Sequence, residues 1–230
     1  MTDLAVTESS PHTPAEAGGA PEDRSEVVRF DVNERVVHWT TAVLMLTLIF
    51  TGAVLYIPTL SLAIGNRGTV EQIHVICGIA LLVPLVLGLA GPWRHLLVRD
   101  LRRVDRWGRS DFDWFRSRGR RKALERDKFN GGQKLEAAFL GAAMVATLVT
   151  GLIMRYAPSS WINWATGATL VHDTLFWAIV IAVGAHIVIA LSRPDQLVSM
   201  MRGRISRVWA REHSAAWLDE IDGARTVRGR

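Results

Sequence analysis

Four long apolar blocks, separated by charged segments, constrain the fold of this chain more than any other feature. Each block is about 20 residues long, the length of an α-helix that crosses a hydrocarbon layer of about 30 Å. Helices of soluble proteins normally keep a polar stripe, so a large soluble helical protein is the less favoured interpretation. The pattern predicts an all-α membrane protein, a bundle of four transmembrane helices over residues 29–192. The blocks run over residues 36–57, 70–91, 135–154 and 170–191.

The segments outside the blocks differ in character. Residues 1–28 are polar, acidic and rich in Pro, Gly and Ala, so we expect a disordered segment. They lack the basic and apolar regions of a signal peptide. A basic loop occupies residues 93–134. Residues 193–230 alternate apolar and basic residues with a helical period, which predicts an amphipathic tail. This tail would lie on the membrane with Trp209 and Trp217 among the lipid headgroups, or dock on a partner subunit.

The placement of positive charge predicts the orientation of the bundle. The 93–134 loop carries fourteen Lys and Arg, and the tail after Leu191 carries eight more. The other two loops carry one Arg each, Arg67 and Arg155. Positive residues beside spans stay on the cytoplasmic side, so we expect both termini and the basic loop to be cytoplasmic. Beside membrane spans, basic runs contact anionic membrane lipid more often than nucleic acid, so we expect no nucleic-acid binding.

Four histidines lie in or at the ends of the blocks, where an unpaired imidazole is costly. The expected orientation places His74 and His172 near the outer surface and His38 and His186 near the inner surface. His172 and His186 are fourteen residues apart in one block, about 21 Å along a helix and within about 40° of the same face. The pattern predicts two pairs of axial ligands, His74/His172 and His38/His186, each for the iron of one haem b.

Two other interpretations of these histidines stay open on the pattern alone. They could be separate interfacial residues, or they could form the proton pathway of a transporter. The blocks contain almost no acidic residues and show no internal repeat, which argues against a transporter. The single cysteine, Cys77, excludes a disulfide framework or a cysteine zinc site within the chain.

A polar turn, "KFNGGQK", precedes the third block at residues 128–134. Asn130 is a plausible N-cap for the following helix. Alternatively, the amides of Asn130 and Gln133, with Gly131 and Gly132 allowing close approach, form a polar pocket for the headgroup of a ligand near the inner histidine pair. On the physical argument alone, the cap is favoured.

These residues together resemble a known family. The stretches are "NERVVHW" at the first block, "FNGGQK" before the third, the two histidines of the fourth, and the tail "SMMRGRISRVWAREHSAAWLDE". They resemble the gamma subunit of respiratory formate dehydrogenase, the di-haem cytochrome b membrane subunit, over about residues 30–221. The resemblance implies the same four haem ligands in the same pairs. It also implies a quinone pocket at Asn130, Gly132 and Gln133 beside His186, in place of a plain cap.

The resemblance further implies partners and a location. Family members lie in the bacterial cytoplasmic membrane, beneath an iron–sulfur beta subunit and a molybdenum or tungsten catalytic alpha subunit on the outer face. The expected function is to relay electrons from formate dehydrogenase through two haems b to menaquinone or ubiquinone at the cytoplasmic side. No catalytic residue for donor oxidation is expected in this chain. The alternatives are a cytochrome b subunit of a nickel–iron hydrogenase or thiosulfate reductase, or a haem-free membrane anchor.

Overall fold

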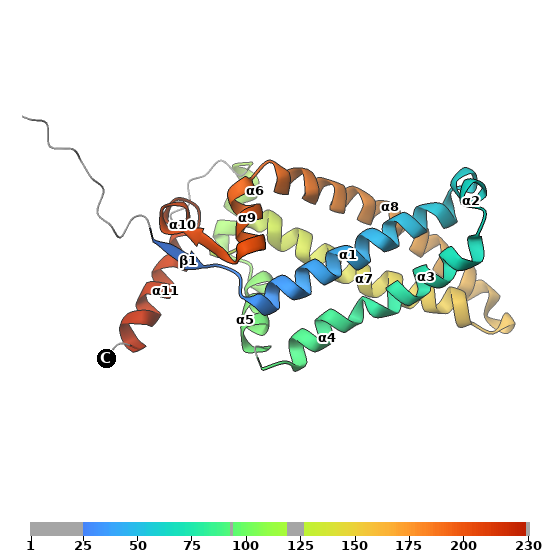
Figure 1. Cartoon of the computed structure of the whole chain (residues 1–230), viewed down its shortest axis with the longest axis horizontal. Coiled ribbons are helices and arrows are strands. Elements are labelled where there is room, and N and C mark those ends of the chain that lie inside the picture. Colours follow the sequence, from blue (N-terminus) through green and yellow to red (C-terminus); the bar gives the residue numbers. More distant parts are fainter. Residues whose placement is uncertain (1–24, 93, 119–126, 229–230) are drawn as a thin grey trace, which may run out of the picture.

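The computed structural model of the chain describes residues 25–92, 94–118 and 127–228. Four long helices run side by side, with the shorter elements gathered at the two ends of the bundle (Figure 1). Within the described residues, each of the four helices is long and apolar enough to cross a membrane. The prediction of an all-α bundle of four membrane-spanning helices is therefore confirmed. The spans are Val32–Tyr56, Arg67–Ala90, Gly131–Tyr156 and Ser159–Leu191.

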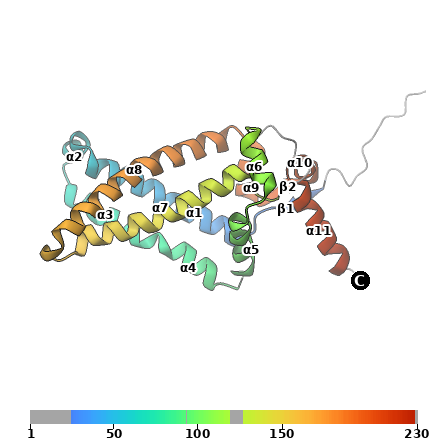
Figure 2. The ribbon, with the colours of Figure 1, turned by 180° about the vertical axis from the view of Figure 1, so that it is seen from behind.

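The short elements define two different ends of the bundle, which we call the α2 end and the α5 end (Figures 1 and 2). The long helices are α1 (Val32–Tyr56), α3 (Arg67–Ala80) with α4 (Leu82–Ala90), α7 (Gly131–Tyr156) and α8 (Ile162–Leu191). The α2 end carries α2 (Pro58–Ile64) and the 3-10 turn η2 (Ser159–Trp161). The α5 end carries α5 (Arg94–Asp105), α6 (Arg109–Arg116), α9 (Pro194–Arg202), α10 (Arg207–His213), α11 (Ala215–Arg228) and strands β1 (Glu26–Val28) and β2 (Arg204–Ser206).

The second span is interrupted where α3 gives way to α4. Pro84 lies three residues beyond the junction at Leu81. Proline has no N–H, and its ring collides with the carbonyl four residues earlier, here that of Ala80. The interruption therefore has a local cause in the sequence. It places Leu81 in the middle of the bundle.

A small core in the middle of the bundle takes one buried residue from each span, and these are Met45, Leu81, Ala143 and Ile179. Ile179 lies seven residues from both His172 and His186. Met45 follows His38 by seven residues, and Leu81 follows His74 by seven. Seven residues are about two helical turns and return to within about 20° of the same face. The core residues and the histidines therefore share the inward faces of their helices.

The N-terminal strand and the C-terminal segment form a second core at the α5 end. Strand β1 pairs antiparallel with β2, with Val27 opposite Ile205. The buried residues of this core are Val27, Ile205, Ala210, Trp217 and Leu218. The C-terminal segment thus has a packing partner within the chain.

This second core corrects two predictions. The disordered segment was expected to reach residue 28, but Glu26–Val28 form β1; residues 1–24 lie outside the described residues. Trp217 was placed among lipid headgroups, but its exposed fraction is only 3%. The headgroup placement of Trp217 was wrong because it treated the tail as one isolated amphipathic helix, whereas β1 and β2 bring an apolar surface against it. Docking of the tail on a partner subunit stays a prediction.

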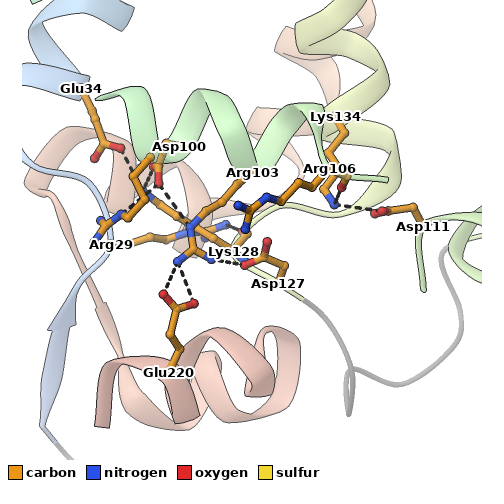
Figure 3. A network of polar contacts seen from close by, with 11 residues as sticks. Arg29, Glu34, Asp100, Arg103, Arg106, Asp111, Asp127, Lys128, Lys134 and Glu220 are labelled. Atoms are coloured by element: carbon orange, nitrogen blue, oxygen red, sulfur yellow. Dashed lines mark hydrogen bonds and ion pairs between the residues drawn. The ribbon is translucent and has the colours of Figure 1, made fainter. Parts of the chain in front are cut away.

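Buried charges tie the α5 end together (Figure 3). The ammonium group of Lys128, just before α7, lies 3.0 Å from a carboxylate oxygen of Glu34 and also bonds Asp100 of α5. Arg103, on the next turn of α5, donates two hydrogen bonds of 2.6 and 2.7 Å to Glu220 of α11. Lys128, Glu34 and Asp100 are all buried, and because an unpartnered buried charge is costly, their pairs set how α1 and α5 meet beside the start of α7. Glu220 is largely exposed, so its bonds to Arg103 join α11 to α5 more weakly.

Candidate functional site

The four predicted ligand histidines form two close pairs, one toward each end of the bundle. The ring centroids of His74 and His172 are 6.2 Å apart, with the ring planes at 64°. Those of His38 and His186 are 6.3 Å apart, with the planes at 48°. Helix α8 supplies one ring to each pair. The structure thus brings together the residues that the sequence argument pairs, and their role as haem ligands stays a prediction.

A threonine hydroxyl contacts each ring of the pair near the α2 end. Thr51 Oγ1 lies 2.8 Å from Nδ1 of His74, and Thr150 Oγ1 lies 3.0 Å from Nδ1 of His172. Each hydroxyl also donates to the carbonyl oxygen four residues earlier, at 2.8 and 2.7 Å. A hydroxyl has only one proton to donate, so its oxygen accepts from the imidazole N–H. This pattern assigns the ring proton to Nδ1 and leaves Nε2 with the lone pair that binds a metal.

A hollow of about 640 Å³ surrounds the His74/His172 pair. This volume lies within the range of about 300–1,000 Å³ for cofactor sites in proteins. Glycines line it directly after the two threonines; a Cβ on Gly151 would lie 3.3 Å from Cε1 of His172. Arg67 and Arg155 also line it. Glu71 and Asp173 line it as well, and Glu71 lies 3.9 Å from Arg155. The hollow therefore suits a largely apolar molecule with polar groups at its charged rim.

The pair near the α5 end has a different support. Glu136 Oε1 on α7 lies 3.1 Å from Nδ1 of His186. A carboxylate only accepts, so Nδ1 carries the proton and Nε2 is again the free ligand atom. Glu136 and Thr150 are fourteen residues apart, as are His186 and His172. Helix α7 has no histidine in its sequence, yet it holds both histidines of α8.

The polar turn before α7 is a cap. Asn130 Oδ1 accepts from the backbone N–H of Gln133 at 3.0 Å, and Gln133 Oε1 accepts from the N–H of Asn130 at 3.1 Å. These reciprocal bonds form a capping box. A Cβ on Gly132 would lie 2.5 Å from the ring of Trp114, so the packing of α6 explains this glycine. Glu136 follows Gln133 by one turn, so the cap lies close to the carboxylate that holds His186. Quinone binding by Asn130, Gly132 and Gln133 stays a prediction.

Sequence reasoning missed Thr51, Thr150 and Glu136. A signal existed for the threonines, because the dipeptide Thr-Gly occurs at 51–52 in the first span and at 150–151 in the third. A threonine inside an apolar helix usually satisfies its hydroxyl on its own backbone, so the pattern alone does not indicate a contact. For Glu136, only the register of α7 against α8 reveals the partner.

Comparison with known proteins places these features in a family context. Residues 29–203 match the model of the family described as prokaryotic cytochrome b561. The cytochrome b556(fdo) subunit of formate dehydrogenase from Escherichia coli K12 is 23% identical over 210 residues, covering 86% of this chain and 94% of that protein. The nitrate-inducible cytochrome b556(Fdn) subunit from the same strain is 24% identical over 211 residues, covering 88% and 94%. The cytochrome b556 subunit from Haemophilus influenzae is 23% identical over 202 residues, covering 85% and 84%.

Replacing Thr150 with Val tests the support of His172. The substitution keeps the shape of the side chain but removes the oxygen that accepts from Nδ1. Loss of such a ligand-orienting bond typically lowers metal affinity by about 10- to 100-fold. We expect a loss of this size for one of the haem sites when the haem-free protein is titrated with haemin. Thr166→Val is the matched control, since the Thr166 hydroxyl is exposed and donates to the carbonyl oxygen of Ile162 on its own helix. Equal affinities in the two variants would contradict the assigned role.

Proposed function

The chain belongs to the prokaryotic cytochrome b561 family, whose model matches residues 29–203, and from this membership we propose that it is a di-haem membrane cytochrome b that carries electrons from formate dehydrogenase to a quinone. The observation that carries the proposal is the arrangement of the two histidine pairs. Their α8 members are fourteen residues apart, so the pairs lie about 21 Å apart along the helix. Such stacking connects the two sides of a membrane of about 30 Å hydrocarbon thickness.

The residues of each pair fit haem b. Two neutral imidazoles are too few ligands for a bare metal ion, but they match the axial positions of an iron held by a porphyrin. With ring centroids 6.2 and 6.3 Å apart, both rings of a pair would hold the same group. Haem b carries two carboxylates, and Arg67 would hold one of them at the pair near the α2 end. Arg155 lies beside it but already faces Glu71 at 3.9 Å. When bound, haem supplies reversible one-electron chemistry.

The chain's own contribution is to orient the ligands and exclude water. Thr51, Thr150 and Glu136 contact Nδ1 of His74, His172 and His186, which would keep the ring proton on Nδ1 and leave Nε2 for a ligand. Between the pairs lies the buried apolar layer of Met45, Leu81, Ala143 and Ile179. A dry apolar layer of this kind separates the two sites from each other and from the aqueous phases.

Charge placement supports the sidedness of the proposal. The α5 end carries the basic segments, so we place it in the cytoplasm together with both termini. The α2 end then faces outward, where we place the iron–sulfur beta subunit and the molybdenum or tungsten alpha subunit. The relatives support formate as the donor because they are named as formate dehydrogenase subunits. The membrane would be the bacterial cytoplasmic membrane.

We place the quinone, menaquinone or ubiquinone, beside the cap of α7. The capping bonds use Oδ1 of Asn130 and Oε1 of Gln133. Each side-chain amide still has an N–H group suited to a quinone oxygen. Nε2 of Gln133 also donates a hydrogen bond of 3.4 Å to Oε1 of Gln196. Gly132 contributes backbone rather than a side chain to this region.

The direct test is donor-dependent reduction in membranes that contain the full complex. We expect formate to produce the visible spectrum of reduced b haem, and added quinone to reoxidise it. Membranes from cells without the catalytic subunit are the control and should show no reduction by formate. Reduction by dihydrogen instead of formate would assign the chain to a hydrogenase. A protein without haem absorption would be the haem-free anchor.

Replacing Glu136 with Gln tests its effect on the inner haem. A carboxylate that accepts the Nδ1 proton makes the imidazole a stronger donor to iron and favours the oxidised state. The neutral amide should therefore raise the midpoint potential of that haem by about 60 mV, equivalent to a tenfold change in a one-electron equilibrium. A redox titration followed by visible spectroscopy measures the shift.

The outer haem serves as the internal reference, and Glu212→Gln, at an exposed position of α10, is the matched control. An unchanged potential of the inner haem would refute this role.

A further inference from the structure

A second hollow, of about 840 Å³, lies at the α5 end between α5 and α11. It is separate from the histidine pairs and from the cap of α7. Its lining is strongly basic. The arginines and the one histidine in the lining are Arg94, His95, Arg99, Arg102, Arg103 and Arg106. We call this hollow the basic groove.

The acidic residues of the basic groove do not balance these charges. Asp127 and Glu220 line it, and both are bonded to Arg103. Arg99 lies 3.8 Å from Asp100 with half of its side chain exposed, so this pair is weak. Within residues 25–92, 94–118 and 127–228, the structure shows no ion pair to Arg94, Arg102 or Arg106. The groove therefore retains unneutralised positive charge.

The arginines form one stripe along α5. Arg99, Arg102 and Arg106 are spaced by three and four residues, the spacing of neighbours on one helix face. All three are exposed, whereas Asp100 and Arg103, between the stripe residues in sequence, are buried, as is Leu97 one turn earlier. The protein thus buries one face of the helix and leaves the arginine face open to the groove. Several guanidinium groups in one hollow suit a phosphate, which they bind through paired hydrogen bonds.

Apolar contacts place the groove at the membrane boundary. Leu89 lines it from the last turn of α4, where the second span ends. Val98 and Ala216 add apolar walls. A soluble phosphate makes no use of such walls, whereas the first carbons of acyl chains do. Basic pockets beside spans on the cytoplasmic side are known binding sites for phospholipid headgroups.

We propose that the basic groove binds the phosphodiester headgroup of an anionic phospholipid. Arg99, Arg102 and Arg106 hold the phosphate oxygens, and Leu89 contacts the acyl chains. The lipid bridges α5 and α11 beside the Arg103–Glu220 bonds, and so joins the C-terminal segment to the membrane surface. This site goes beyond the proposed electron transfer and does not depend on it.

The test is lipid titration of the full-length purified protein, followed by native mass spectrometry. Cardiolipin is the probe, phosphatidylcholine is the neutral reference and inorganic phosphate is the soluble competitor. The groove variant replaces Arg99, Arg102 and Arg106 with Gln. The control variant replaces the exposed residues Arg202, Arg204 and Arg211 with Gln, an equal loss of charge at the same end of the bundle.

We expect the apparent cardiolipin affinity to fall about 10- to 100-fold in the groove variant and to change by less than about threefold in the control. Arg102→Glu alone changes an exposed side chain outside the buried ion pairs and should also lower the affinity.

Equal losses in the groove and control variants would reduce the effect to general surface charge and overturn the proposal. Equal binding of phosphatidylcholine, or displacement of cardiolipin by millimolar phosphate, would also overturn it. None of these readouts requires haem or electron transfer, so they are independent of the proposed function.

Discussion

An imidazole inside a hydrocarbon layer needs a partner for both ring nitrogens, and the rest of this structure follows from that requirement. Water cannot supply the partners, so neighbouring helices must. For three of the four histidines, Nδ1 lies within hydrogen-bond distance of a threonine hydroxyl or a carboxylate oxygen. In the proposed function, the opposite nitrogens hold a shared ligand within each pair. The bundle therefore holds its helices in the one register that supplies these contacts.

The seven-residue spacing makes this register possible, because two helical turns return to nearly the same helix face. The histidines of α8 lie seven residues on either side of Ile179, and Glu136 and Thr150 of α7 flank Ala143 in the same way. Polar supports at both levels thus share one face with the apolar layer between them. The charge network of Lys128 and its partners fixes the start of α7, and so the height of Glu136 against α8. The same helix faces therefore carry both the apolar contacts of the core and the polar contacts to the histidines.

The sequence supported much of this arrangement. The four spans follow from apolar length, and the pairing of histidines follows from charge asymmetry together with helix rise. The cap at Asn130 follows from local backbone chemistry and is present. The supports at Thr51 and Glu136 did not follow, because they depend on which faces of adjacent helices meet. The burial of Trp217 did not follow either, because it needs a strand pairing between segments about 180 residues apart, and local periodicity carries no information on such contacts.

The measurement that tests the central claim most directly is the haem content per chain, determined by the pyridine haemochrome method on purified protein. The account predicts about two b haems for the wild type and about one for either His172→Ala or His186→Ala, since α8 supplies one ligand to each pair. His213→Ala, an exposed change on α10, should keep both. A wild type without haem, after expression with adequate haem supply, would contradict the account. So would the loss of both haems from a folded single variant, because the two pairs would then not be separate sites.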